Sequence, residues 1–289
     1  IAITSGWNYL FVPVHLIPEK KWKETGVHFS TFVQYDTTEK IIFAFGIDQF
    51  IEEQENLVIA SKDGYIKKID IAEMKLQRYS RATKAMNLKG EDEVISAQKI
   101  PAQNEMNIIL VTQDGFYNCF SPTEVPLAGV KAQGVKSMKL GKEDFVVTMY
   151  IGYDTDSVIL FTNKNTYKRV PLAILEYTGR YKKGSRVIRP MKTQKYEIIG
   201  SAEFGTTVNI IEENQTEQQI IDKLPLADLE TVGKKIETTS DVLAVVPLEV
   251  ATIGTEETPK QTSKVVDDID KTADELTKLL EEQGVLFDE

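Results

Sequence analysis

Residues 58–69 read Val58-Ile59-Ala60-Ser61-Lys62-Asp63-Gly64-Tyr65-Ile66-Lys67-Lys68-Ile69. One β-rich run leads into a polar two-residue turn that ends in Gly64, and a second β-rich run follows. The same pattern returns in residues 109–120 and 159–170, where Gly115 and Asn165 stand at the turn. Gly and Asn adopt the positive φ of a tight hairpin at the lowest cost. We therefore predict three successive β-hairpins, whose turns lie 51 and 50 residues apart.

The period extends in both directions along the chain. Residues 3–14 match residues 161–172 and share their apolar-Pro-apolar ending, and residues 208–226 contain a weaker copy. A fixed period of this kind indicates a repeat architecture. The predicted units are 1–55, 56–103, 104–154, 155–202 and 203–252.

Each unit also contains a second landmark. An apolar strand and a polar loop lead to a closing apolar strand, such as the one in residues 93–97. Four short strands are the content of one blade, and radial stacking of blades limits the exposed edges of an antiparallel protein. We therefore expect an all-β fold of about five four-stranded blades in residues 1–254. The alternative is an irregular β-sandwich, which rarely keeps so even a period.

Composition limits the possible functions. The 289 residues are 42% hydrophobic, which is enough for a large core. No apolar run approaches the roughly 18 residues of a membrane helix, and no signal segment opens the chain, so we expect a cytoplasmic protein with no membrane partner. The chain does not begin with Met, which suggests a fragment. Cys119, His15 and His28 cannot form a disulfide framework or a zinc site, so we expect no metal. The sequence also offers no candidate pair of nucleophile and base, so we expect no catalytic centre in this chain.

The net charge of −10 is unevenly distributed. Residues 1–211 contain 27 Lys and Arg against 24 Asp and Glu, whereas residues 212–289 contain 7 against 20. This asymmetry is typical of an acidic tail attached to a body that binds negative charge.

The positive charge is concentrated in loops. Residues 164–192 contain nine cations and one acid, Glu176. Within them, the loop Tyr177-Thr178-Gly179-Arg180-Tyr181-Lys182-Lys183-Gly184-Ser185-Arg186 mixes glycines, a serine and aromatic rings with cations. We expect the four cations of this loop to lie together with no acid nearby. Small residues let a phosphate backbone approach the main chain, and cations neutralise it.

Weaker copies of this basic loop occupy residues 77–84 and 129–139. A lone basic run is usually a solvated surface, but repetition at the period of the blades favours a track that binds phosphates. Because no cluster of Asn, Gln and Arg is suited to a major groove, we expect contact with the nucleic-acid backbone and little sequence preference.

Three features of the sequence resemble the C-terminal domains of bacterial type IIA topoisomerase A subunits. They are the repeated Ser/Thr-Lys-Asp-Gly-aromatic motif, the closing segment Leu88-Lys89-Gly90-Glu91-Asp92-Glu93-Val94-Ile95, and the opening segments 8–15 and 22–28. The resemblance covers about residues 1–250 and is greatest to the topoisomerase IV branch of Gram-positive bacteria. The motif that distinguishes gyrase, Gln-Arg-Arg-Gly-Gly-Lys-Gly, is kept only at Gln77 and Arg78. This departure favours topoisomerase IV over a gyrase wrapping domain.

The resemblance implies a β-pinwheel, a relative of the propeller whose blades exchange strands, with DNA bound on a basic outer rim. It also implies a non-catalytic module that positions DNA for decatenation and supercoil relaxation, within a holoenzyme that combines the rest of a dimeric A subunit with an ATPase B subunit. ATP and Mg²⁺ would then be bound outside this chain. A propeller-like scaffold for protein partners is the alternative of another class. The candidate DNA-binding residues are Lys67, Lys68, Arg78, Arg81, Lys84, Lys131, Lys136, Lys139, Lys168, Arg169, Arg180, Lys182, Lys183, Arg186, Arg189 and Lys192.

Residues 255–289 form the acidic tail. Val266, Ile269, Ala273, Leu276 and Leu280 have the spacing of one helix face, so we expect a short helix or a disordered segment. If the acids of the tail oppose DNA, truncation before Thr255 raises DNA affinity at low salt.

Overall fold

The computed structural model describes residues 1–248, except 22, 192–194, 213–214, 221–223, 230 and 239. The described residues form strands and short 3₁₀ helices, and no α-helix occurs among them. All described residues belong to one compact unit, Ile1–Leu248. The predicted acidic tail, 255–289, lies outside the described residues.

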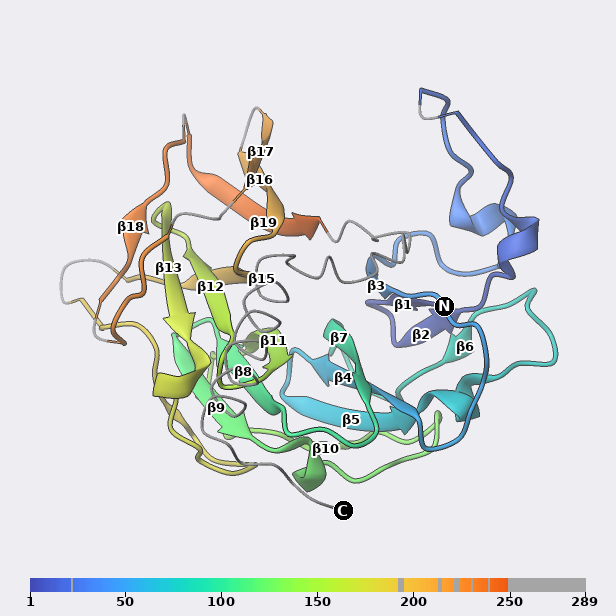
Figure 1. Cartoon of the computed structure of the whole chain (residues 1–289), viewed down its shortest axis with the longest axis horizontal. Helices are drawn as coiled ribbons and strands as arrows, with labels where there is room; N and C mark the ends of the chain where they lie inside the picture. Colours follow the sequence, from blue (N-terminus) through green and yellow to red (C-terminus); the bar gives the residue numbers. More distant parts are fainter. Residues whose placement is uncertain are drawn as a thin grey trace, which may run out of the picture. The chain divides into compact units, whose positions relative to one another are not determined.

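The strands form five antiparallel sheets that follow one another in chain order (Figure 1). The first contains, in spatial order, β3 (Ile41–Ala44), β1 (Ala2–Thr4), β2 (Asn8–Leu10) and β6 (Thr83–Lys84). The second contains β10 (Val135–Lys136), β5 (Tyr65–Asp70), β4 (Glu55–Ser61) and β7 (Val94–Pro101). The third contains β11 (Val146–Gly152), β8 (Asn107–Thr112), β9 (Phe116–Phe120) and β14 (Ser185–Arg186). The fourth contains β15 (Ile198–Glu203), β12 (Ser157–Thr162), β13 (Thr166–Pro171) and β18 (Lys234–Lys235). The fifth contains β17 (Thr216–Ile220), β16 (Thr207–Glu212) and β19 (Val242–Leu248).

Each four-stranded sheet receives one edge strand from the following repeat. We call β6, β10, β14 and β18 the exchanged strands, and the edge that they form the outer edge of each sheet. For example, β14 is encoded after the fourth hairpin but pairs with β9 of the third sheet. This exchange confirms the β-pinwheel that the resemblance implied. In the described residues the fifth sheet has three strands.

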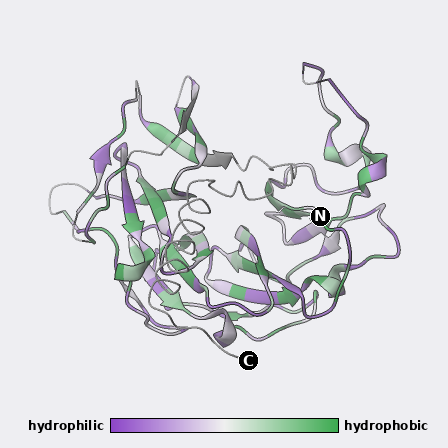
Figure 2. Ribbon diagram, viewed as in Figure 1, coloured by the Kyte–Doolittle hydropathy of each residue, from purple (hydrophilic) through white to green (hydrophobic). Residues whose placement is uncertain are grey.

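The hairpin turns confirm the sequence prediction. Gly64, Gly115 and Asn165 have φ values of 75°, 77° and 54°. Trp7, which aligns with Asn165, has a φ of 71°, although a positive φ is uncommon for a bulky residue. The first strand of each later hairpin is central and largely apolar, as Figure 2 shows for β12, whereas the exchanged strand β18 is hydrophilic. An interior strand is covered on both faces, which explains why its apolar residues do not alternate with polar ones.

The core lies between consecutive sheets. Four apolar clusters each join one sheet to the next, through residues such as Ile59 and Tyr9, Ile108 and Val58, Leu160 and Tyr117, and Ile210 and Phe161. Opposite the outer edge, β7 contacts β3 and β11, and β15 contacts β11 and β19. Burial between sheets therefore leaves the outer edges free to carry polar side chains.

Among the described residues, five 3₁₀ helices connect the strands, namely η1 (Val14–Leu16), η2 (Phe29–Thr31), η3 (Ile71–Met74), η4 (Pro122–Glu124) and η5 (Leu172–Ile174). The last three each follow the second strand of a hairpin. The Asp70 and Ser121 side chains cap η3 and η4 by accepting main-chain N–H groups. These turns begin the connections that lead to the next outer edge.

Candidate nucleic-acid interface

Every exchanged strand ends in a cation. These four residues, which we call the edge cations, are Lys84, Lys136, Arg186 and Lys235. They lie opposite equivalent residues at the start of the neighbouring strand, namely Asn8, Tyr65, Phe116 and Thr166. Their spacing is 52, 50 and 49 residues. The fold thus places one positive charge at the same position on each of four sheets.

A glycine brings three of the exchanged strands close to their neighbours. Gly134, Gly184 and Gly233 precede β10, β14 and β18 and have φ values of 89°, 77° and 90°. A Cβ at these positions would lie 3.0, 2.7 and 2.8 Å from the carbonyl carbons of Ile66, Tyr117 and Tyr167, and still nearer to the oxygens. Only glycine allows this approach together with a positive φ. The Gly-x-cation pattern therefore encodes the exchanged strand and its charge together.

Three of the edge cations lie over aromatic rings. The distances from the charged group to the ring centroid are 5.8 Å for Lys84 and Trp7, 3.7 Å for Lys136 and Tyr65, and 4.3 Å for Arg186 and Phe116. A ring attracts a cation without neutralising it. These side chains therefore keep their full positive charge at the surface.

The basic loop 177–186 leads into β14 and continues the outer edge toward the second sheet. The Arg180 guanidinium donates to the main-chain oxygen of Lys136 at 2.7 Å. The Arg180 N–H donates to the Glu124 carboxylate at 2.8 Å, and the Tyr177 hydroxyl donates to the same carboxylate. Burial acts to raise the pKa of Glu124, but these hydrogen bonds lower it overall. The prediction that no acid lies near this loop is therefore wrong, because η4 brings Glu124 against it.

The rest of this loop is exposed. Lys182 and Lys183 are exposed, and the Lys183 ammonium lies 4.9 Å from the centroid of Phe116. Tyr181, which is 47% exposed, has a φ of 63° and lies 5.3 Å from the ammonium of Lys139. Rings and cations therefore alternate on this surface, as the sequence predicted.

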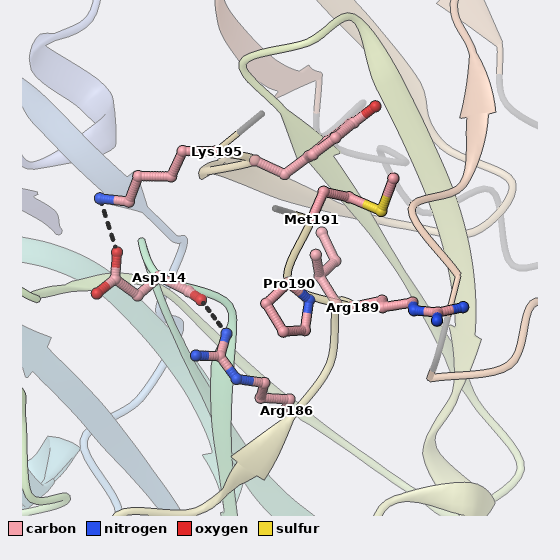
Figure 3. A pocket seen from close by; sticks show the side chains of 8 residues that line it. Asp114, Arg186, Arg189, Pro190, Met191 and Lys195 are labelled. Carbon is pink, nitrogen blue, oxygen red and sulfur yellow. Dashed lines mark hydrogen bonds and ion pairs between the residues drawn. The ribbon is translucent and has the colours of Figure 1, made fainter. Parts of the chain in front are cut away.

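A pocket of about 170 Å³ lies beside β14 (Figure 3). Its lining includes Arg186, Arg189 and Lys195. The Lys195 ammonium lies 3.0 Å from the carboxylate of Asp114 and 2.9 Å from that of Glu197, whereas Arg186 donates to the main-chain oxygen of Asp114 at 3.3 Å. The exposed Arg189 has no acidic partner among the described residues. The pocket therefore keeps excess positive charge.

Lys67 does not belong to this surface. Its side chain is fully buried, and its ammonium donates to the carbonyls of Ala85, Val130 and Ala132 at 2.8, 2.7 and 3.1 Å. Burial lowers the pKa of Lys67 to about 8. Ala85 follows the exchanged strand of the first sheet, whereas residues 130–132 precede that of the second. Lys67 therefore ties two exchanged segments together, and its predicted contact with DNA is wrong.

Lys168 is buried in the same way. It donates to the carbonyl of Val187 at 2.8 Å and to those of Asp228 and Thr231 at 2.9 and 3.0 Å, and burial lowers its pKa to about 8. At the intervening sheet boundary Asn118 has the equivalent role and donates to the carbonyls of Ser137 and Gly179. The prediction of a DNA contact is wrong for Lys168 too, because the ammonium is enclosed by main chain.

Other predicted contacts are partly engaged or unplaced. The half-buried Lys68 donates to the carbonyl of Pro122 at 2.8 Å, and the Arg169 guanidinium lies 3.4 Å from the centroid of Phe204. The side chains of Arg78, Arg81 and Lys131 are exposed in the loops before β6 and β10. Lys192 lies outside the described residues. Sequence reasoning missed Lys234 and Lys235, although Gly233-Lys234-Lys235 repeats the Gly-x-cation pattern.

Comparison with known proteins places this fold in a family. A model of the DNA gyrase C-terminal domain, a β-propeller, matches residues 55–101, 107–151 and 156–199. The chain belongs to this family. The three matched segments of the gyrase C-terminal domain family coincide with the second, third and fourth hairpins and their closing strands.

Similar members of the family are A subunits of DNA topoisomerase 4. The relative from Bacillus subtilis (strain 168) is 34% identical over 74% of this chain and 26% of its own length. The relative from Staphylococcus epidermidis is 29% identical over 83% of this chain and 30% of its own length. The chain thus spans less than a third of the length of these curated relatives.

Solved structures agree with this assignment. The C-terminal domain of DNA topoisomerase IV has a TM-score of 0.78 and 27% identity, and the match covers 86% of this chain and 78% of that one. A DNA gyrase A C-terminal domain has a TM-score of 0.68 at 14% identity, covers 86% of this chain and 81% of that one, and shows the shared fold.

Two further features of the described residues bear on other functions. No helix in this part of the chain is long and apolar enough to cross a membrane. In the same part, no group of three or more His, Cys, Asp and Glu side chains is arranged to hold a metal ion.

Proposed function

We propose that this domain binds duplex DNA through the phosphate backbone along its outer edge. The observation that carries the proposal is the set of four edge cations, which the exchanged strands place at equivalent positions on successive sheets. Cations that neutralise phosphates release condensed counterions, and this release drives binding without regard to sequence. A repeated charge suits a repeated ligand such as the sugar-phosphate backbone.

The domain acts as a non-catalytic module within the A subunit of a topoisomerase IV. It captures and bends the DNA segment that is transported, and so supports decatenation and the relaxation of supercoils. Bending 20–30 base pairs costs on the order of 1–6 kcal/mol, which phosphate contacts along the edge offset. Its partners in the cytoplasm are the remainder of a dimeric A subunit, together with an ATPase B subunit. ATP and Mg²⁺ are bound elsewhere in that holoenzyme.

Salt-dependent binding tests the proposal directly. Fluorescence anisotropy with a duplex of mixed sequence measures the DNA affinity at salt concentrations from about 50 to about 200 mM. Over this range an affinity that depends on phosphate contacts falls steeply. If about 4–8 phosphates are contacted, log affinity falls with log salt at a slope of about −4 to −7. A second duplex of unrelated sequence should bind equally well.

A matched pair of variants locates the site. Replacing all four edge cations by Met should reduce the salt slope by about 3 to 4 units, since each phosphate contact contributes about 0.9. The control replaces four exposed lysines that lie outside the exchanged strands, namely Lys21, Lys40, Lys89 and Lys142. Both variants lose the same net charge. Equal loss of affinity in the two would show that only overall charge matters and would refute the outer-edge site.

A further inference from the structure

The edge cations of the second and third sheets are each held at two points. The Lys136 ammonium lies 3.7 Å from the centroid of the Tyr65 ring and donates to the main-chain oxygen of Asp63 at 2.8 Å. Tyr65 lies directly opposite Lys136 in the register, and Asp63 precedes the turn glycine of the same hairpin. A ring and a turn carbonyl therefore fix this long side chain together.

Arg186 repeats this arrangement on the third sheet. Its guanidinium lies 4.3 Å from the centroid of Phe116 and donates to the main-chain oxygen of Asp114 at 3.3 Å. Phe116 is opposite Arg186 in the register, and Asp114 also precedes a turn glycine. Equivalent residues in two repeats thus hold equivalent cations in the same way.

The other two edge cations are held less firmly. Lys84 lies over Trp7 at 5.8 Å, and its ammonium donates to no carbonyl in the described residues. Lys235 faces Thr166, which has no ring, and the described part of the chain shows no hydrogen bond, ion pair or ring contact of its side chain. The four cations are therefore equivalent in position but differ in the number of contacts that hold their side chains.

A contact that holds a cationic side chain in place helps DNA binding only if the contacting group does not cancel the positive charge. Lys62 and Lys195 are held by carboxylates, which cancel their charge. A ring face and a carbonyl hold a cation without cancelling it. Binding a phosphate with a long, mobile side chain costs conformational entropy, and a side chain that is already ordered avoids most of that cost.

We infer that Tyr65 and Phe116 are positioning residues that hold Lys136 and Arg186 ready for phosphates, so that the second and third sheets form the strongest part of the DNA track. This inference rests on the proposed function. It ranks the repeats by the aromatic residue that begins the second strand of each hairpin, rather than by the number of cations in each loop.

Ring removal at constant charge tests the inference. Tyr65→Leu and Phe116→Leu should each weaken DNA binding by about two- to tenfold, which is the range expected for ordering one long side chain. The salt slope should stay unchanged because no charge is lost, whereas Lys136→Met should lower it by about 0.9. Tyr65→Phe and Phe116→Tyr keep the ring and should bind like the wild type. Tyr153→Leu removes a ring that is 44% exposed and lies over no cation of the described residues, so it is the matched control.

The outcomes separate the inference from the proposed function. If Tyr65→Leu and Phe116→Leu bind as tightly as the wild type, or more tightly, while Lys136→Met and Arg186→Met bind weakly, the positioning role is refuted and the DNA track stands. If the two Met variants change neither affinity nor slope, the proposed function itself fails. If Lys235→Met reduces DNA affinity as much as Lys136→Met does, the ranking of the sheets is also contradicted.

Discussion

Gly184→Ala should destabilise the domain by far more than its backbone conformation alone requires. A left-handed conformation costs a residue with a Cβ about 1–2 kcal/mol. In addition, the new Cβ would lie 2.7 Å from the carbonyl carbon of Tyr117, which is main chain and cannot rotate away. The exchanged strand β14 must therefore withdraw from β9. Withdrawal exposes part of Val187 and Ile188, which are 1% and 2% exposed, and full exposure of such a side chain costs about 1.5–3 kcal/mol.

If withdrawal exposes about half of each of these two side chains, it adds about 1.5–3 kcal/mol, and the expected total is a loss of about 2.5–5 kcal/mol. Gly90→Ala is the matched control, because Gly90 has a φ of 66° and nothing within 4 Å of its Cβ position. It should cost only the conformational part, about 1–2 kcal/mol. At about 2–4 °C per kcal/mol for a domain of this size, calorimetry should show Tm losses of about 5–20 °C for Gly184→Ala and about 2–8 °C for Gly90→Ala.

If Gly184→Ala does not fold, Gly134→Ala provides the same comparison at a carbonyl carbon 3.0 Å away and should fall between the other two variants. Similar losses for all three variants would refute the reasoning, because they would show that close approach of the exchanged strands adds nothing to the cost of a positive φ. Gly184→Ala should also weaken DNA binding, since β14 carries Arg186.

Three further predictions concern the lysines. Lys67→Met should lower the free energy of unfolding by about 2 kcal/mol in urea titrations, because buried carbonyls lose their donor, and should leave the salt slope of DNA binding unchanged, whereas Lys142→Met should alter stability little. Lys67 and Lys168 have pKa values lowered to about 8 in the folded chain but 10.5 when unfolded, so unfolding takes up protons between these values. Relative to the double Met variant, the wild type should therefore become more stable from pH 8 toward pH 10.5, and a constant difference between pH 7 and 10 would contradict this. Lys235→Met should reduce the salt slope by about 0.9, and an unchanged slope would remove the fourth sheet from the DNA track.

The hairpins could be predicted because their signal is local. Gly64, Gly115 and Asn165 stand at turns that need a positive φ, and the flanking apolar runs are long enough to identify the strands. The partner of each exchanged strand could not be predicted in the same way. A two-residue strand such as β14 has no pattern of its own, and its position depends on the space that Gly184 leaves against a hairpin encoded about seventy residues earlier.

The burial of Lys67 shows a similar limit. Alternation along a strand places Lys67 and Lys68 on opposite faces, but does not show which face is covered. The cover comes from Val130 and Ala132, which are 63 and 65 residues away. The edge cations are easier to predict from the sequence, because the Gly-x-cation pattern recurs at Gly134, Gly184 and Gly233. The same pattern, extended through the fifth repeat, points to Lys235.

Strand exchange has a consequence for how the chain matures on the ribosome. The first sheet cannot gain its fourth strand until Lys84 has emerged, the second until Lys136, the third until Arg186 and the fourth until Lys235. Sheets are therefore completed in the order of synthesis. Each new repeat supplies the last strand of the preceding sheet, while its own sheet still lacks its outer-edge strand. A nascent chain that stops anywhere within this unit ends in an unfinished sheet, so the direction of translation is also the direction of assembly.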